Sequence, residues 1–401
     1  MTIRIIYITL LFLMILVLYY FGQSLKKDYR IFSNAGIAAL AAYTLNEGLR
    51  FGRGIDYNIY WRNYDHFAAG WDSSKEPAFD LIQSFFLYFN LPFQALVIFM
   101  SFMFILGLLS LMRQYRLIVP IALPLFALYS LYEVENMVRW YLAYSIFLIG
   151  LSYLLEEGKI NKKYICFSVL ACLFHYAFIP IPIIFYIIYL KNGTLFRPII
   201  SFSIFLAVYL LFETEMLLFL TEPINFITAS TGTFEGYSDR AEYWLTGGYA
   251  DNYVSGILGW GLILFLFTVT FAGYKPVQKL GRNYTYAYNL FIIGMILFPI
   301  AKKIELILRY QQTFYFFQSV VVAASIYMYF VWKRIELHYI LLMGVFLIYL
   351  NSCRIYFTVP IQGNPKKYLY VWDKTNENYN SILNIYLNDA YKSSLKQKRD
   401  K

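Results

Sequence analysis

Long apolar runs recur from one end of the chain to the other, with short polar segments between them. Most of these runs are close to the ~20 residues that an α-helix needs to cross a bilayer. The pattern therefore predicts membrane-spanning helices along nearly the whole chain. The candidate spans are 4–22, 33–49, 91–112, 117–132, 137–155, 164–190, 198–220, 254–273, 285–301, 309–331 and 338–358.

Composition supports the same class of protein. The chain of 401 residues is 60% hydrophobic and only 14% charged, whereas soluble domains carry roughly a quarter charged residues. We predict an all-α polytopic membrane protein with about 10–12 transmembrane helices. An architecture like that of the GT-C glycosyltransferases is compatible with this pattern.

The first apolar run resembles a signal peptide but is expected to be a retained helix. It lies in MTIRIIYITLLFLMILVLYYFG. The run is longer than the usual apolar region of a signal peptide, and no small-x-small cleavage site follows it. We therefore interpret residues 4–22 as the first membrane helix.

The distribution of basic residues predicts which segments face the cytoplasm, because cytoplasmic loops are enriched in Lys and Arg. The clearly basic segments are 24–30, 113–116, 157–163, 274–282 and 332–334. The opposite side should carry 50–78 and the acidic segment 221–253. This places the N-terminus and both of these segments outside.

Segment 164–190 decides whether this topology is consistent. If it crosses the membrane once, the acidic 221–253 falls in the cytoplasm and the basic 274–282 falls outside. Pro180 and Pro182 interrupt the helical pattern near its middle. A segment that enters and returns, as a re-entrant hairpin or two short helices, places every clear loop correctly. The alternative is a single proline-kinked helix.

We expect one transmembrane domain, residues 1–358, and a tail, residues 359–401. The tail contains SILNIYLNDAYKSSL, whose apolar residues have helical spacing and predict an interfacial helix. The topology places the tail outside, although its last residues are basic.

Charge and cysteine content limit the partners. The net charge of +10 suits cytoplasmic loops and anionic lipid headgroups, so the lipid bilayer is an expected partner and nucleic acid is not. The three cysteines show no metal-site spacing and no disulfide framework. We expect no metal ion and no cofactor.

Several polar side chains should converge on the outer face, and most of them are arginines. Charged groups within or beside membrane spans are costly and need a reason. Guanidinium groups bind phosphate oxygens in bidentate fashion and stay charged at physiological pH. They therefore suggest an anionic ligand. The residues expected there are Arg50, Arg53, Asp56, Glu76, Arg139, His175, Arg240 and Arg309.

Structural explanations compete with this interpretation. Arginines at helix ends often extend to lipid headgroups. His175 could be a hydrogen-bonded core residue, and Asp56 could simply pair with Arg53. The 40 tyrosines and 37 phenylalanines suit stacking against sugar rings, but aromatic residues are also common at membrane interfaces.

Five segments carry a resemblance to a known family: LRFGRGIDYNIY, KEPAFDLIQSFF, NMVRWYLAYSIFLIGLSYLLEEGKINKKY, LACLFHYAFIPIP and LRYQQTFYFF. With these segments, in order from about residue 20 to 330, the chain resembles the EpsG/Wzy-type bacterial polysaccharide polymerases. It departs from the family pattern at Tyr176–Ala177, where a small hydroxyl-bearing residue is usual, and at Trp140, where glutamine is common.

The resemblance implies a polymerase of O-antigen, capsule or exopolysaccharide. Such enzymes join oligosaccharide repeats linked to undecaprenyl diphosphate on the outer face of the bacterial cytoplasmic membrane. A chain-length regulator and a flippase are the implied protein partners. The chemistry needs charge neutralisation at the leaving diphosphate and a base near the acceptor hydroxyl.

These two needs assign expected roles to the candidate residues. Arginines 53, 139 and 309 would bind diphosphate, and Arg240 would also bind substrate. Asp56 or Glu76 would be the base, with His175 as the alternative. Arg50 and Tyr57 would orient these groups.

Three other functions stay open. A glycosyltransferase using a lipid-phosphate sugar donor could hold a metal ion at Glu133 and Glu135, two acids expected in an outer loop. A flippase or transporter of lipid-linked sugar would need basic residues at several depths, whereas these gather towards one face. An O-acyltransferase using His175 would need an acyl-donor route from the cytoplasm, for which no motif is present.

Overall fold

The protein is almost entirely helical. The computed structural model describes residues 2–54, 56–70, 76–213, 257–301, 304–358 and 369–373. The expected outer segment 221–253, with Arg240, lies outside the described residues, as does most of the tail. The chain forms two compact units, residues 1–182 with 346–401 and residues 183–345.

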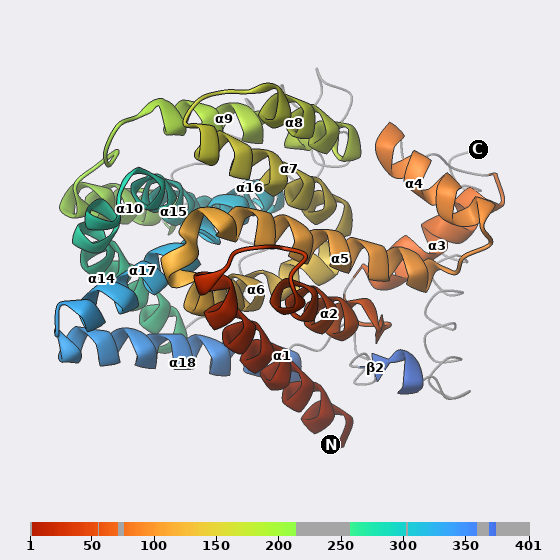
Figure 1. Cartoon of the computed structure of the whole chain (residues 1–401), viewed down its shortest axis with the longest axis horizontal. Helices are drawn as coiled ribbons and strands as arrows, with labels where there is room; N and C mark the ends of the chain where they lie inside the picture. Colours follow the sequence, from red (N-terminus) through yellow and green to blue (C-terminus); the bar gives the residue numbers. More distant parts are fainter. Residues whose placement is uncertain are drawn as a thin grey trace. The chain divides into compact units, whose positions relative to one another are not determined.

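The first unit contains most of the candidate site residues. Helix α1 packs against α2 and α6, and α5 packs against α2 and α7 (Figure 1). Gly107 allows α5 to approach the backbone of Ser145 in α7, because a side chain there would collide with it. The elements are α1 (Thr2–Lys27), α2 (Asn34–Gly48), β1 (Arg50–Phe51), α3 (Tyr57–Ala68), α4 (Pro77–Tyr88), α5 (Phe93–Met112), the 3₁₀ helix η1 (Arg113–Ile118), α6 (Val119–Asn136), α7 (Val138–Glu157), α8 (Lys162–Phe174) and the 3₁₀ helix η2 (Tyr176–Phe178).

The segment 164–190 is broken, as the prolines predicted, but the break precedes them. Helix α8 ends at Phe174, and His175 has an extended backbone (φ −159°, ψ 107°). Pro180 and Pro182 lie in the first turn of α9 (Pro180–Leu190), where backbone N–H groups lack helical partners anyway.

The chain also turns back at this break. The hydroxyl of Tyr164, near the start of α8, donates to the carbonyl oxygen of Pro182 at 2.6 Å. A continuous helix would separate these two residues by ~27 Å. The local fold is therefore that of two short helices joined by a turn. The membrane side of each neighbouring loop stays a prediction.

The second unit is built around α15, which packs against α10, α14, α16 and α17. Gly294 lets the backbone of Tyr315 approach α15, and Gln311 donates to the Gly294 carbonyl oxygen at 3.1 Å. The remaining elements are α9, which begins in the first unit, α10 (Pro198–Glu213), α14 (Ile257–Leu280), α15 (Arg282–Ala301), α16 (Glu305–Tyr315), α17 (Gln318–Val331) and α18 (Ile335–Thr358), which ends in the first unit.

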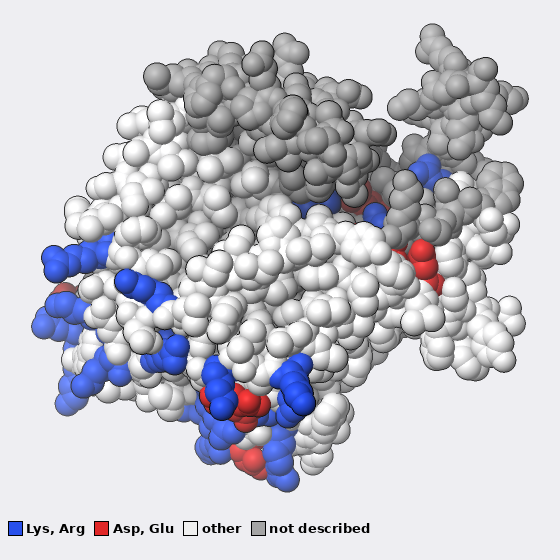
Figure 2. All heavy atoms as spheres, turned by 90° about the horizontal axis from the view of Figure 1, so that it is seen from above, with Lys and Arg blue, Asp and Glu red and all other residues white. Residues whose placement is uncertain are grey.

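The prediction of an all-α polytopic membrane protein is confirmed. Among the described residues, six helical segments are long and apolar enough to cross a membrane. One of them, Phe93–Asn136, contains α5, η1 and α6. In Figure 2 most of the described surface is uncharged, and the charged side chains lie in groups, as expected where lipid covers the rest.

Segment 50–78, expected as an outer loop, is largely folded. It contains β1 and α3, and it leads into α4. Strand β1 pairs antiparallel with β2 (Leu369–Tyr370), which precedes the 3₁₀ helix η5 (Val371–Asp373). Residues 369–370 of the tail therefore lie beside Arg50 and Phe51, which agrees with placing both segments on one side of the membrane.

Candidate functional site

Three predicted site residues meet in the first unit, from segments far apart in the sequence. The carboxylate of Glu76 contacts Arg139 through Oε2, at 2.8 Å from Nη1, and the Nδ1 of His175 through Oε1. Glu76 precedes α4, Arg139 lies in the first turn of α7, and His175 ends α8. We call Glu76, Arg139 and His175 the Glu76 triad.

Arg139 is the more accessible charge of the triad. Its side chain is 31% exposed, against 9% for that of Glu76. Its guanidinium carbon also lies 5.9 Å from the ring centres of Tyr60 and Phe79. Because guanidinium carries five N–H donors, Arg139 can hold Glu76 and still bind an incoming anion.

His175 is positioned from both sides of its ring. The Glu76 carboxylate accepts the hydrogen of Nδ1, and Trp140 packs edge-on with ring centres 5.4 Å apart. A carboxylate on Nδ1 fixes the tautomer in which Nε2 can accept a proton. Among the described residues, none forms a hydrogen bond with Nε2. The triad therefore presents a base beside a cation.

The second group of charges is sealed inside the first unit. Arg53 has no exposed surface and bridges two acids, with Nη2 3.0 Å from Glu47 and Nε 2.7 Å from Glu135. Arg50 is 2% exposed and lies 3.9 Å from Glu47. We call Glu47, Arg50, Arg53 and Glu135 the buried ion cluster. Paired opposite charges explain how these ions tolerate complete burial.

The buried ion cluster ties the β1 region to the junction of α6 and α7. Gly54, next to Arg53, has φ +103°, and a Cβ there would lie 2.7 Å from the Glu135 carbonyl oxygen. The close approach and the left-handed backbone both require glycine. Helix α7 begins at this junction, and Arg139 is its second residue. The cluster thus supports the Glu76 triad without being part of it.

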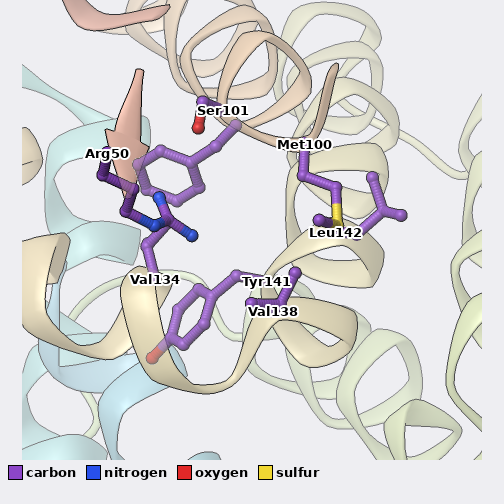
Figure 3. A pocket seen from close by; sticks show the side chains of 8 residues that line it. Arg50, Met100, Ser101, Val134, Val138, Tyr141 and Leu142 are labelled. Atoms are coloured by element: carbon purple, nitrogen blue, oxygen red, sulfur yellow. The ribbon is translucent and has the colours of Figure 1, made fainter. Parts of the chain in front are cut away.

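Arg50 points into a small pocket between three helices (Figure 3). The pocket leaves about 10 Å³ for the centres of water molecules, which is room for about one water. A phosphate or a sugar does not fit there. A substrate-binding role for Arg50 stays a prediction, and in this conformation it would act indirectly. The lining comprises Arg50, Met100, Ser101, Phe104, Val134, Val138, Tyr141 and Leu142.

Tyr57 is buried and helps to hold β1 in place. Burial raises the pKa of its phenol, so the hydroxyl stays protonated and donates to Oε1 of Gln94 at 3.0 Å. Gln94 in turn donates to the carbonyl oxygen of Arg50 at 3.0 Å. This chain of hydrogen bonds supports the expected orienting role of Tyr57, which stays a prediction.

The remaining candidates are Asp56, Arg309 and Arg240, the last of which lies outside the described residues. Asp56 is half-buried at the start of α3, where its carbonyl oxygen accepts from the Tyr60 N–H at 3.0 Å. Arg53, three residues earlier, forms ion pairs with Glu47 and Glu135. Arg309 is half-buried on α16 of the second unit. The roles of all three stay predictions.

The expectation that two acids, Glu133 and Glu135, lie in an outer loop is wrong. Glu133 and Glu135 lie in the last turn of α6, not in a loop. Residues two apart on a helix point in different directions, and Glu135 is held by Arg53. Among the described residues, no group of three His, Cys, Asp or Glu side chains could hold a metal ion.

Sequence reasoning missed how the charges are partitioned. Glu47 is not among the predicted site residues, although it lies three residues before Arg50 at the end of an apolar helix. An acid so placed needs a buried partner, and that was the available signal. The pairing of Glu76 with His175 spans 99 residues and leaves no local pattern.

Comparison with known proteins agrees with the resemblance. The sequence model described as the EpsG family matches residues 36–362. No curated protein matches the chain, and no solved structure does. The matched range includes the Glu76 triad and the buried ion cluster.

Proposed function

The chain belongs to the EpsG family, and from this premise we propose that it joins lipid-diphosphate-linked oligosaccharide repeats into a polysaccharide. Membership indicates a glycosyltransferase activity of the polysaccharide polymerase type. The proposal adds the donor, undecaprenyl-diphosphate-linked oligosaccharide, and the place, the outer face of the bacterial cytoplasmic membrane. The Glu76 triad is the observation that carries it.

The reaction needs a base, and His175 is the candidate that the contacts favour. Its Nε2 would take the proton of an acceptor hydroxyl while Glu76 stabilises the resulting imidazolium through Nδ1. The acceptor oxygen then bonds to the anomeric carbon of the donor. Of the three candidate bases, Glu76 and His175 thus act together.

The reaction also needs a cation at the leaving group. As the bond between the anomeric carbon and the diphosphate oxygen breaks, its electron pair stays on the diphosphate. Arg139 is part-exposed and adjacent to Glu76, so it can stabilise that charge without a metal ion. The products are a glycan longer by one repeat and undecaprenyl diphosphate.

The test is restoration of long glycan chains in a strain that lacks this gene. Wild type should restore them, whereas Arg139→Ala should be present in the membrane and leave single repeats. Arg62→Ala, on α3, is the matched control and should polymerise normally. Failure of wild type to restore chains would exclude the polymerase, and normal polymer from Arg139→Ala would exclude this site.

A further inference from the structure

Tyr60 lies on α3 between two tyrosines that hold this helix in place. The hydroxyl of Tyr57 donates to Gln94 at 3.0 Å, and that of Tyr64 donates to the Leu91 carbonyl oxygen at 2.8 Å. Residues spaced by three and four positions share one side of a helix. Both neighbours are buried, whereas Tyr60 is half-buried. The helix is thus anchored on each side of Tyr60 by other hydroxyl groups.

The hydroxyl of Tyr60 contacts the Glu76 triad instead. It forms a hydrogen bond with the Arg139 side chain, whose guanidinium carbon lies 5.9 Å from the centre of the Tyr60 ring. Arginine side chains have donors only, so the Tyr60 oxygen accepts in this bond. The phenolic hydrogen is therefore not used by Arg139. Among the described residues, none accepts it in a hydrogen bond.

A second donor beside Arg139 answers a need of this site. Glu76 accepts from Arg139 and neutralises part of its charge, which weakens the attraction of Arg139 for a further anion. A neutral phenol adds a hydrogen-bond donor without adding another cation for Glu76 to attract. A hydrogen bond to a charged acceptor is stronger than one between neutral groups. Arg139 and Tyr60 together can therefore bind two oxygens of one phosphate group.

We propose that Tyr60 binds the substrate, donating its hydroxyl hydrogen to an oxygen of the phosphate group that Arg139 binds. The identity of that group as the leaving diphosphate rests on the proposed function. No proton is transferred. The electron pair of the breaking bond stays on the diphosphate, and the hydrogen bond from Tyr60 strengthens as charge accumulates there. Tyr60 is thus a further catalytic residue, whereas Tyr57 and Tyr64 hold α3 in position.

The first test measures binding of undecaprenyl diphosphate to the purified full chain in detergent, with undecaprenol as the phosphate-free comparison. Tyr60→Phe keeps the ring beside Arg139 and should weaken binding of the diphosphate by about 10- to 100-fold, as expected for a lost hydrogen bond to a charged group. Binding of undecaprenol should not change. Tyr64→Phe, on the same helix, is the matched control and should bind both lipids like wild type. Unchanged diphosphate binding in Tyr60→Phe, or none in wild type, would overturn the proposal.

A second test separates donation to the substrate from positioning of Arg139. Tyr60 is replaced by 3,5-difluorotyrosine, whose phenol loses its proton near neutral pH, and diphosphate binding is measured across that range. Wild type at each pH corrects for titration of His175, Glu76 and the ligand. If Tyr60 donates to the phosphate, affinity should fall at least about tenfold as the phenol ionises. If it only accepts from Arg139, affinity would stay or rise, because an ionised oxygen is the stronger acceptor, and the proposal would be overturned.

Neither test requires polymer. If wild type restores no long chains while binding still depends on Tyr60, the proposed function falls and the anion site stands. If wild type polymerises and Tyr60→Phe binds and polymerises equally well, the role of Tyr60 alone falls.

Discussion

The buried ion cluster and the Glu76 triad contain the same kinds of charge but differ in access. Arg53 is fully enclosed and shared between two acids, whereas the Arg139 side chain is 31% exposed and shares Glu76 with a histidine. An enclosed ion pair stabilises one arrangement of helices and cannot reach a substrate. A part-exposed pair next to a histidine can bind an anion and transfer a proton. Access, not charge, therefore separates the enclosed ion cluster from the triad that we propose takes part in the reaction.

The largest effect should come from removing the base. His175→Ala is expected to lower polymerisation by about 10²–10⁴-fold, the range typical of losing a general base. Protein abundance should stay near that of wild type. The measurement is the rate of chain extension in isolated membranes, normalised to protein. His338→Ala, on α18, is the matched control. Retention of activity in His175→Ala would mean that another residue acts as the base.

Removing the bridging arginine should act on stability instead. Arg53→Met leaves two carboxylates buried without their shared partner, at a cost of about 3–5 kcal/mol. Thermal unfolding in detergent should show this, with Arg62→Met, at a half-buried position on α3, as the control. Adding Glu47→Gln and Glu135→Gln should recover part of the loss. A variant that is fully stable but no longer binds lipid diphosphate would place Arg53 in the site after all.

A conservative change should separate charge from geometry at Arg139. Arg139→Lys keeps the charge but loses the planar fork that binds Glu76 and an anion together. We expect kcat/KM to fall by roughly tenfold, or about 1.4 kcal/mol, with little change in stability. An unchanged kcat/KM would mean that Arg139 acts only as a diffuse positive charge.

The smallest effect should follow loss of one hydroxyl. Tyr57→Phe removes the hydrogen bond to Gln94 and should lower stability by about 1 kcal/mol. Tyr88→Phe, on the exposed face of α4, is the matched control and should leave thermal unfolding unchanged. If Tyr57→Phe instead abolishes activity at normal stability, the hydroxyl contacts the reaction directly.

The fold class followed from the sequence because the lipid bilayer requires long apolar helices, and such helices can be recognised as long apolar runs in the sequence. The break in 164–190 was also predictable, since proline removes a helical hydrogen bond and disrupts the interior of a long helix. Its position at His175 was not. The prolines begin the next helix, and packing of Phe178 against Trp140 and Phe147 accompanies the turn.

The members of the Glu76 triad were among the predicted candidates, but their grouping was not predictable. Glu76, Arg139 and His175 were each identified, because charged or polar groups beside membrane spans are costly. Nothing in the sequence distinguished them from Arg50 and Arg53, since burial depends on which helices enclose a residue. The burial of Arg53 depends on α1, whose Tyr7 ring lies 4.5 Å from its guanidinium, 46 positions away in the chain.

The most direct test of the distinction between the Glu76 triad and the buried ion cluster compares two isosteric changes, Glu76→Gln and Glu135→Gln, in the strain lacking the gene. Each removes one carboxylate charge and keeps the shape of the side chain. The measured quantity is the ratio of long glycan to single repeats, per amount of protein in the membrane. We expect Glu76→Gln to be abundant and to leave single repeats, and Glu135→Gln to polymerise in proportion to its abundance. Long chains from Glu76→Gln at normal abundance would contradict the central role of the Glu76 triad.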